Sequence, residues 1–154
     1  MTVLKPVGKV KSDFENPKDL VFACEKGLDT QTHSKIVINK EYVEGLEGLE
    51  EFSHIFIMYV LDKATKLELK THPGPPSEKD LPSVGVFASR SQYRPNHIAL
   101  RLVKLLKVER NTLHVQGLDA INNSKVIDVK PYVKGFDRPE EYECAGWYDW
   151  LEND

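Results

Sequence analysis

The fold class is decided by two apolar segments joined by a short polar turn, HIALRLVKLLKVERNTLHVQG at residues 97–117. Residues 97–108 are long enough for an extended strand and carry Ile98, Leu100 and Leu102 on one face. Arg110 and Asn111 make a tight turn, because asparagine tolerates the backbone conformations that such turns need. Apolar and polar residues then alternate over residues 113–117, which is typical of a half-buried strand. The segment therefore predicts an antiparallel hairpin.

Strand patterns also dominate outside this hairpin. Residues 53–61 are almost continuously apolar and rich in β-formers, which predicts a strand buried on both faces. Further strands are expected at residues 3–10, 34–39, 84–88 and 126–132, with a second turn at residues 121–124. Short strands with tight turns at this spacing predict a closed or nearly closed antiparallel barrel. The expected fold is thus mostly β, a small antiparallel barrel with short helical segments and without a Rossmann sheet.

Three segments do not fit a strand. Residues 41–49 contain two glycines and form a short helical turn at most. Residues 64–82 include four prolines, which lack the backbone N–H of a central strand, so we expect a long loop with a functional role. Residues 134–154 are acidic and aromatic, and we expect the rings of Trp147, Tyr148 and Trp150 to pack on the barrel. The length predicts one domain over residues 1–154, with residues 134–154 as a C-terminal tail.

Composition and charge narrow the class of protein. The longest apolar run, residues 55–61, is far shorter than the roughly 20 residues that span a bilayer. The first six residues contain no apolar signal core, so we expect an unprocessed cytoplasmic protein. Cys24 and Cys144 form no C-x-x-C pair, which argues against a zinc ribbon, and we expect no disulfide in a reducing compartment. With a net charge of -3, any contact with nucleic acid must use a local basic patch.

Several familiar catalytic motifs are absent from the sequence. It contains no G-x-G-x-x-G after a strand, no P-loop, no H-E-x-x-H and no G-x-S-x-G. The five histidines have no metal-ligand spacing, so no metal is expected. His54 lies in an apolar strand and is interpreted as a hydrogen-bonded core histidine rather than a base.

Two polar segments remain as candidate sites. The loop over residues 89–96 carries Arg90 and Arg94, which either clamp an anion or bond to carbonyls of their own loop. The turn over residues 119–124 leads into the last strand, where Asp128 and Lys130 share a face. Charges on such a strand mark either a solvated edge or a site. The residues alone leave both pairs of alternatives open.

Three motifs in order resemble one family. They are GLEGLEEFSHI at residues 45–55, GVFASRS followed by YRPN at residues 85–96, and VIDVKPY at residues 126–132. Their order and spacing are similar to the TsaA-like family over nearly the whole chain, and the characterised bacterial members of that family are tRNA methyltransferases. The resemblance implies a β-barrel that binds S-adenosyl-L-methionine and a homodimer with the site near the subunit interface. It implies a tRNA substrate, with methyl transfer to N6 of the threonylcarbamoyladenosine beside the anticodon.

The resemblance also implies site residues. Arg90 would hold a carboxylate of the cofactor or of the substrate, and the turn from Asp119 would contact the cofactor. Asp128 would orient a group or accept a proton, and Arg94 would take part in catalysis. If they share a face, Arg94, Lys104 and Lys107 would bind phosphates of the tRNA backbone, and the alternative for the two lysines is ordinary solvation. The cofactor-binding residues that the resemblance implies are Pro17, Lys18, Asp19, Asp62, Lys63, Arg90, Leu100, Asp119, Ala120, Ile121, Asn122 and Ser124.

Two departures from the family pattern keep other functions open. Asp62-Lys63 stands where the family has His-Gln, and His97-Ile98-Ala99 stands where it has Pro-Ile-Gly. Both changes fit a methyltransferase with a different acceptor. They also fit a module that binds S-adenosyl-L-methionine and senses it without catalysis.

Overall fold

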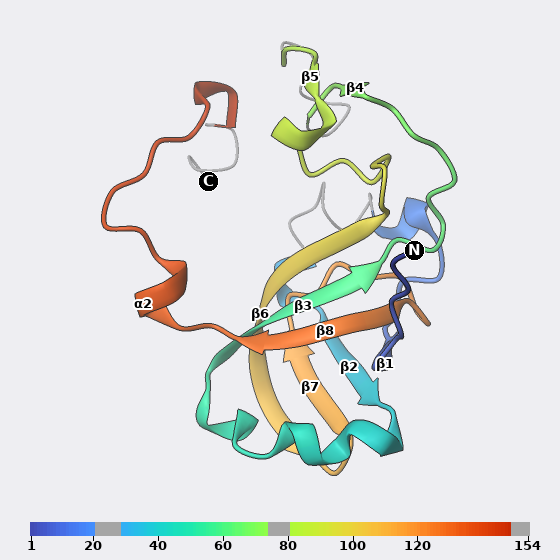
Figure 1. Ribbon diagram of the computed structural model, residues 1–154, viewed down its shortest axis with the longest axis vertical. Helices are drawn as coiled ribbons and strands as arrows, with labels where there is room; N and C mark the ends of the chain where they lie inside the picture. The colour runs from blue at the N-terminus through green and yellow to red at the C-terminus, as the bar shows by residue number, and fades with distance from the viewer. Residues whose placement is uncertain (21–28, 74–80, 149–154) are drawn as a thin grey trace.

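A closed antiparallel barrel forms the body of the molecule (Figure 1). The computed structural model describes residues 1–20, 29–73 and 81–148. Within these residues the barrel strands follow the order β1-β2-β7-β6-β3-β8, and β8 pairs back to β1. Their bounds are β1 Gly8–Lys11, β2 His33–Ile38, β3 His54–Val60, β6 Ile98–Glu109, β7 Thr112–Gln116 and β8 Lys125–Pro131. The predicted barrel is confirmed.

The predicted hairpin is present as β6 and β7. Its turn places Arg110 at a φ of 55°, a left-handed conformation that closes the tight reversal. The first strand is shorter than predicted and begins at Gly8. Pro6 has no backbone N–H to give to a neighbouring strand, and residues 1–5 are exposed.

Burial alternates along the strands, as a barrel wall requires. On β3, Ile55, Ile57 and Tyr59 are buried in the interior, whereas the residues between them are partly exposed. The prediction that β3 is buried on both faces is therefore wrong, because the outer face of the wall meets solvent. Phe56 on that outer face packs against Tyr132 with ring centroids 6.1 Å apart, which explains its apolar character.

Short elements cover the two ends of the barrel. The 3-10 helices Lys40–Leu46 and Leu49–Glu51 lie at one end, and they confirm the short helical turn predicted there. Figure 1 shows the two-stranded ribbon of β4 (Lys70–Thr71) and β5 (Val84–Gly85) beyond the opposite end. The remaining short elements are helical residues 17–20, the 3-10 helices Asp29–Gln31, Val86–Ala88 and Gly146–Tyr148, and α2 Lys134–Asp137.

The C-terminal tail leaves the barrel wall after β8. Residues 134–146 are exposed, and Figure 1 shows this segment running beside the barrel strands toward the end that carries β4 and β5. Trp147 and Tyr148 stack on each other, with centroids 4.1 Å apart. Trp147 and Tyr148 are half-buried, and the expected packing of the tail's aromatic rings on the barrel stays a prediction. Cys144 is an exposed free thiol, and Cys24, residues 74–80 of the long loop and Trp150 lie outside the described residues.

Candidate functional site at the open end of the barrel

The barrel interior changes from apolar to polar at one end. Ile57 on β3 pairs with Arg101 on β6, and Tyr59 pairs with Ala99. Because inward positions alternate along each strand, Tyr59 follows the buried Ile57 and Arg101 precedes the buried Val103. A phenol and a guanidinium thus stand where the hydrophobic core ends.

These two side chains hold the carboxylate of Asp119. The Tyr59 hydroxyl donates to Asp119 Oδ1 at 2.7 Å and lies 3.1 Å from the Asp119 carbonyl oxygen. Arg101 Nη1 lies 3.7 Å from Asp119 Oδ2, and Arg101 Nε donates to the Gly117 carbonyl at 3.1 Å. The Asp119 side chain keeps 29% of its surface exposed, so it is fixed in direction and still faces solvent. Such an oriented anion suits a cationic or hydrogen-bonding ligand.

The turn after Asp119 is built by contacts with the segment that follows β1. Ser12 Oγ donates to the Ala120 carbonyl at 2.7 Å, and Ser12 N donates to Asn122 Oδ1 at 3.1 Å. Asn123 takes a φ of 70°, and Ser124 Oγ donates to the Ile121 carbonyl at 2.6 Å. Ala120 and Asn122 therefore shape the turn, while Asp119, Ile121 and Ser124 line the cleft.

The two arginines of the loop after β5 differ in their contacts. Arg94 Nη1 donates to the carbonyls of Ser89 and Ser91, at 2.9 and 3.1 Å. The buried Ser89 hydroxyl also donates to the Val86 carbonyl at 2.8 Å. Arg90 is exposed and has no hydrogen bond or ion pair to any residue that the structure describes. Arg94 thus stabilises the loop, and Arg90 is available to an anionic ligand.

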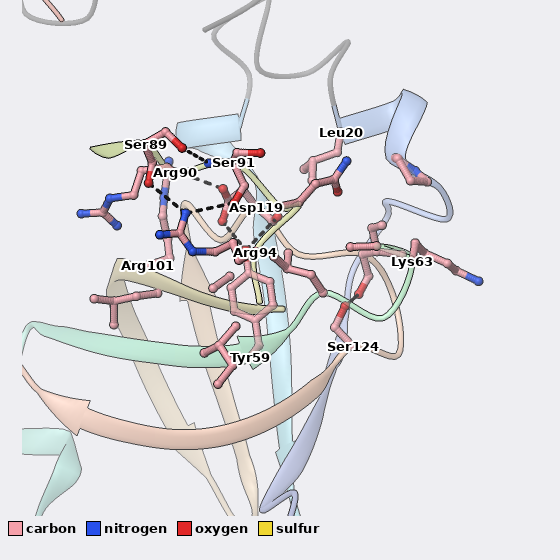
Figure 2. Close-up of a pocket in the computed structure, with 18 of the residues that line it drawn as sticks. Leu20, Tyr59, Lys63, Ser89, Arg90, Ser91, Arg94, Arg101, Asp119 and Ser124 are labelled. Carbon is pink, nitrogen blue, oxygen red and sulfur yellow. Dashed lines mark hydrogen bonds and ion pairs between the residues drawn. The ribbon is translucent and has the colours of Figure 1, made fainter. Parts of the chain in front are cut away.

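A cleft of about 1010 Å³ joins these groups. Its charged lining residues are Lys63, Arg90, Arg94 and Arg101 against Asp62 and Asp119, so positive charge is in excess. Both faces of the first half of β6 line it, including Ile98, Leu100 and Leu102. Figure 2 shows the three arginines on one side and Leu20 and Lys63 on the other. An apolar wall beside charged groups is the usual composition of a site for a small ligand.

The cleft contains some, but not all, of the site residues that were predicted from the sequence. The cleft brings together Pro17, Asp62, Lys63, Arg90, Arg94, Leu100, Asp119, Ile121 and Ser124. Lys18, Asp19, Ala120, Asn122 and Asp128 are not among its lining residues. Asn16 Oδ1 accepts from the amides of Lys18 and Asp19, which makes this segment the capped start of a helix. All of the proposed binding roles stay predictions.

Asp128 lies apart from the cleft on the outer face of β8. It pairs with Met58, accepts a hydrogen bond from the Val129 amide at 2.9 Å and lies 3.5 Å from Lys130 Nζ. Its side chain is 48% exposed. This is the solvated-edge alternative that the sequence left open, and it brings Asp128 to none of the cleft groups.

Sequence reasoning missed several lining residues. Tyr59 and Arg101 lie inside apolar strand segments, where a single polar side chain is easily interpreted as structural. Their position in the strands could have indicated them, since each is the next inward-facing residue beyond a buried core residue. Other lining residues without a sequence-based role are Leu20, Leu61, Ala64, Phe87, Ser89, Ser91, Gln92, Ile98, Ala99, Leu102, Cys144 and Tyr148.

Two searches of the described residues gave negative results. No group of three or more His, Cys, Asp or Glu side chains in the described ranges is arranged to hold a metal ion. Among the same residues, no helix has the length and apolar character needed to cross a bilayer.

Comparison with known proteins relates the chain to one family. Residues 9–138 match the family described as tRNA-methyltransferase O N-terminal domain. The chain is 40% identical over 141 residues to an Archaeoglobus fulgidus protein named S-adenosyl-L-methionine-binding protein, covering 92% of this chain and 96% of that protein. It is 35% identical over 140 residues to a human protein named tRNA (adenine(37)-N6)-methyltransferase, covering 88% of this chain and 31% of that protein.

A solved structure has the same fold. The crystal structure of TrmO from Pseudomonas aeruginosa superposes with a TM-score of 0.71 at 26% identity, covering 93% of this chain and 61% of the other. The chain thus spans about three fifths of the TrmO structure and about a third of the human protein. The match over residues 9–138 includes the barrel strands β2 to β8 and the cleft residues from Pro17 to Asp119, so this chain belongs to the tRNA-methyltransferase O N-terminal domain family.

Proposed function

We propose that the chain is an S-adenosyl-L-methionine-dependent tRNA methyltransferase that binds its cofactor in the cleft at the open end of the barrel. The observation that carries the proposal is the shared cleft, since it unites Arg90, Leu100 and Asp119 from three separate segments. Relatives at 40% and 35% identity are named for S-adenosyl-L-methionine binding and for tRNA methylation. The proposed reaction on tRNA supports a cytoplasmic location.

The groups of the cleft fit the chemistry of this cofactor. The cofactor carries an amino group, a carboxylate, a sulfonium and an adenosine. Asp119, oriented by Tyr59 at 2.7 Å, offers an acceptor to an ammonium or to ribose hydroxyls. Arg90 offers its guanidinium to a carboxylate. Leu100 and Leu102 offer apolar surface to the purine ring and to the carbon atoms around the sulfonium.

The contribution of the chain to the reaction is positioning. When bound, the cofactor supplies an electrophilic methyl group on sulfur. The chain's residues hold the acceptor nitrogen in line with that methyl group and exclude water, which can lower a barrier by several kcal/mol. Because the sulfonium charge disperses during transfer, a site rich in carboxylates would not help the chemistry. The cleft is not rich in carboxylates, since Asp62 and Asp119 are the two among its lining residues.

The acceptor in this proposal is N6 of threonylcarbamoyladenosine next to the anticodon. That substrate adds a threonyl carboxylate. Arg90 and Lys63 are cleft cations without an ion pair to any described residue, and Arg90 is the one that meets the carboxylate in this proposal. The catalytic roles predicted for Asp128 and Arg94 have less support. Asp128 lies outside the cleft, and Arg94 already donates to two loop carbonyls.

Two copies pair in this proposal along the outer face of β6. Ile98, Leu100, Leu102 and Leu106 are 37–45% exposed on that strand, which is unusual for a row of large apolar side chains. The first three also line the cleft, so a second copy on β6 would complete its wall. Leu106 belongs to this row of exposed side chains and lies outside the cleft. Leu106→Glu should therefore convert the dimer to a monomer, as measured by light scattering. Leu67→Glu, an exposed leucine off β6, should leave the assembly unchanged.

A methyl-transfer assay tests the proposed reaction. Purified chain is incubated with methyl-labelled cofactor and tRNA that carries or lacks the threonylcarbamoyl group. Label that appears only in the modified tRNA supports the proposal. Transfer to another acceptor assigns a different substrate. Saturable cofactor binding without transfer to any RNA supports a sensing module, which is the alternative favoured by the binding-protein names of the archaeal relatives.

A further inference from the structure

A row of lysines crosses the outer surface of β1 and its two neighbours. Lys9 on β1 pairs directly with Lys125 on β8, and Lys11 on β1 pairs directly with Lys35 on β2. All four side chains are exposed, and the residues next to them on each strand point into the core. We call these four residues the lysine row. The barrel register thus creates two like-charge pairs on three adjacent strands.

Directly opposed like charges destabilise a sheet. The other outward positions of these strands are His33, Val37, Ile127, Asp128 and Lys130, and the one carboxylate among them, Asp128, lies 3.5 Å from Lys130. Lys11 Nζ donates to the neutral Asn123 Oδ1 at 2.6 Å. Lys9, Lys35 and Lys125 have no ion pair with any residue in the described part of the chain.

Two of the three other lysines on the described barrel strands are neutralised by neighbours, whereas Lys104 on β6 has no ion pair with a described residue. Lys130 lies 3.5 Å from Asp128, and Lys107 lies 3.2 Å from Glu109. The hydrogen bond from Lys107 is the main reason that the pKa of Glu109 lies below its usual value. Charge compensation is therefore common on this barrel, and the lysine row lacks it. Lys107, which we expected to bind phosphate, is already paired with Glu109.

The row begins at the rim of the cleft. Asn123, the partner of Lys11, belongs to the turn that supplies Asp119, Ile121 and Ser124 to the cleft lining. From there the row continues along β1 to Lys9 and across to Lys125 and Lys35. Lys9 and Lys11 are two residues apart, about 7 Å along a strand.

We propose that the lysine row is a binding surface for the sugar-phosphate backbone of the RNA whose nucleotide enters the cleft. This inference rests on the proposed function for the identity of the RNA. With an overall charge of -3, the chain gains affinity for a polyanion only where its positive charge is local and uncompensated. Phosphate contacts position an RNA without reading its bases, so the row sets register while the cleft selects the nucleotide.

Paired variants test the surface. Lys9→Gln with Lys35→Gln removes two positive charges from the row, and Lys40→Gln with Lys134→Gln removes two exposed charges from other elements. Affinity for tRNA is measured by filter binding between 50 and 200 mM salt, at roughly the range where phosphate contacts respond most. We expect the row variant to raise the Kd about tenfold and to reduce the salt slope by about 2. The Lys40/Lys134 variant should change the Kd less than about twofold.

Two additional measurements keep the outcome clear. Cofactor affinity should be unchanged in the row variant, because its side chains face solvent away from the core. The melting temperature should not fall, because the variant removes one lysine from each of the two like-charge pairs. Lys9→Arg with Lys35→Arg should restore tRNA affinity, since it restores charge. Equal Kd values and salt slopes for the row variant and the Lys40/Lys134 variant would overturn the proposal. So would loss of binding to anionic lipid vesicles in the row variant with unchanged tRNA binding.

The assay separates this inference from the proposed reaction. Lysine-dependent tRNA binding without methyl transfer would contradict the reaction and support the row. Methyl transfer with a KM for tRNA that is unchanged in the row variant would support the reaction and contradict the row.

Discussion

The Tyr59 hydroxyl and the Asp119 carboxylate are joined by a 2.7 Å hydrogen bond at the level where the apolar core of the barrel ends. Tyr59 is 3% exposed and its ring belongs to the core. A rigid core position therefore orients a group on a loop. The packed core thereby fixes the direction of a carboxylate that lines the cleft.

Tyr59→Phe tests that relationship. The change keeps the ring in the core and removes the donor to a charged group, a bond worth about 1.5–3 kcal/mol when fully formed. Asp119 is partly exposed, so we expect a stability loss of about 1 kcal/mol and about a tenfold weaker affinity for S-adenosyl-L-methionine. Urea unfolding and titration calorimetry measure the two effects. Tyr42→Phe is the matched control, because Tyr42 is 37% exposed on a 3-10 helix outside the cleft. Equal cofactor affinities in both variants would contradict the role of Tyr59.

Arg90→Gln should weaken ligand binding without weakening the fold. The side chain is exposed and has no partner in the described ranges, so its removal should change the unfolding free energy by less than about 0.5 kcal/mol. Loss of a guanidinium–carboxylate contact should raise the KM for the carboxylate-bearing substrate or the cofactor about tenfold. Steady-state methyl transfer and thermal melting separate the effects. Arg138→Gln, an exposed arginine after α2, should change neither, and a matching loss in both variants would refute the assignment.

Arg94→Gln should weaken the stability of its loop more than it weakens ligand binding. Its guanidinium joins the carbonyls of Ser89 and Ser91, so the variant should lose about 1–3 kcal/mol of local stability in the loop. Hydrogen exchange should be faster for the amides of residues 89–93, with less change in the barrel strands. A large fall in kcat with unchanged exchange in this loop would instead support the catalytic role predicted from the sequence.

Gly8→Ala should destabilise the barrel closure. An added Cβ would lie 2.4 Å from the Val37 carbonyl oxygen of β2, a backbone atom that cannot rotate away. We expect a loss of about 1–3 kcal/mol, the usual range for overpacking. Gly45→Ala is the control, since nothing lies within 4 Å of its Cβ position. Urea unfolding that gave the same midpoint for Gly8→Ala as for the native chain would contradict the close approach of β1 and β2.

The sequence predicted the fold better than the site. Alternation in β7 and the turn at Arg110 and Asn111 were sufficient to indicate the hairpin, because local periodicity reflects which face is buried. The turn predicted at residues 121–124 is present, because turn residues at a strand end are a local signal. Its role in cofactor binding stays a prediction.

Contacts between distant segments were beyond prediction. Tyr59 and Asp119 are 60 positions apart, and only the strand register brings them together. Arg90 and Arg94 looked equivalent in the sequence, and the carbonyls of Ser89 and Ser91 distinguish them. Asp128 had the residue type of a proton acceptor, but the register of β8 puts it on the outer wall.

The central claim is that one small barrel binds a single sulfonium cofactor between the loop of Arg90 and the turn of Asp119. A crystal structure of the chain with S-adenosylhomocysteine tests it most directly. We expect the ligand in the cleft, in contact with Arg90, Leu100 and Asp119 of one chain or of two paired copies. Ligand bound at another surface, with these three residues free of it, would contradict the account.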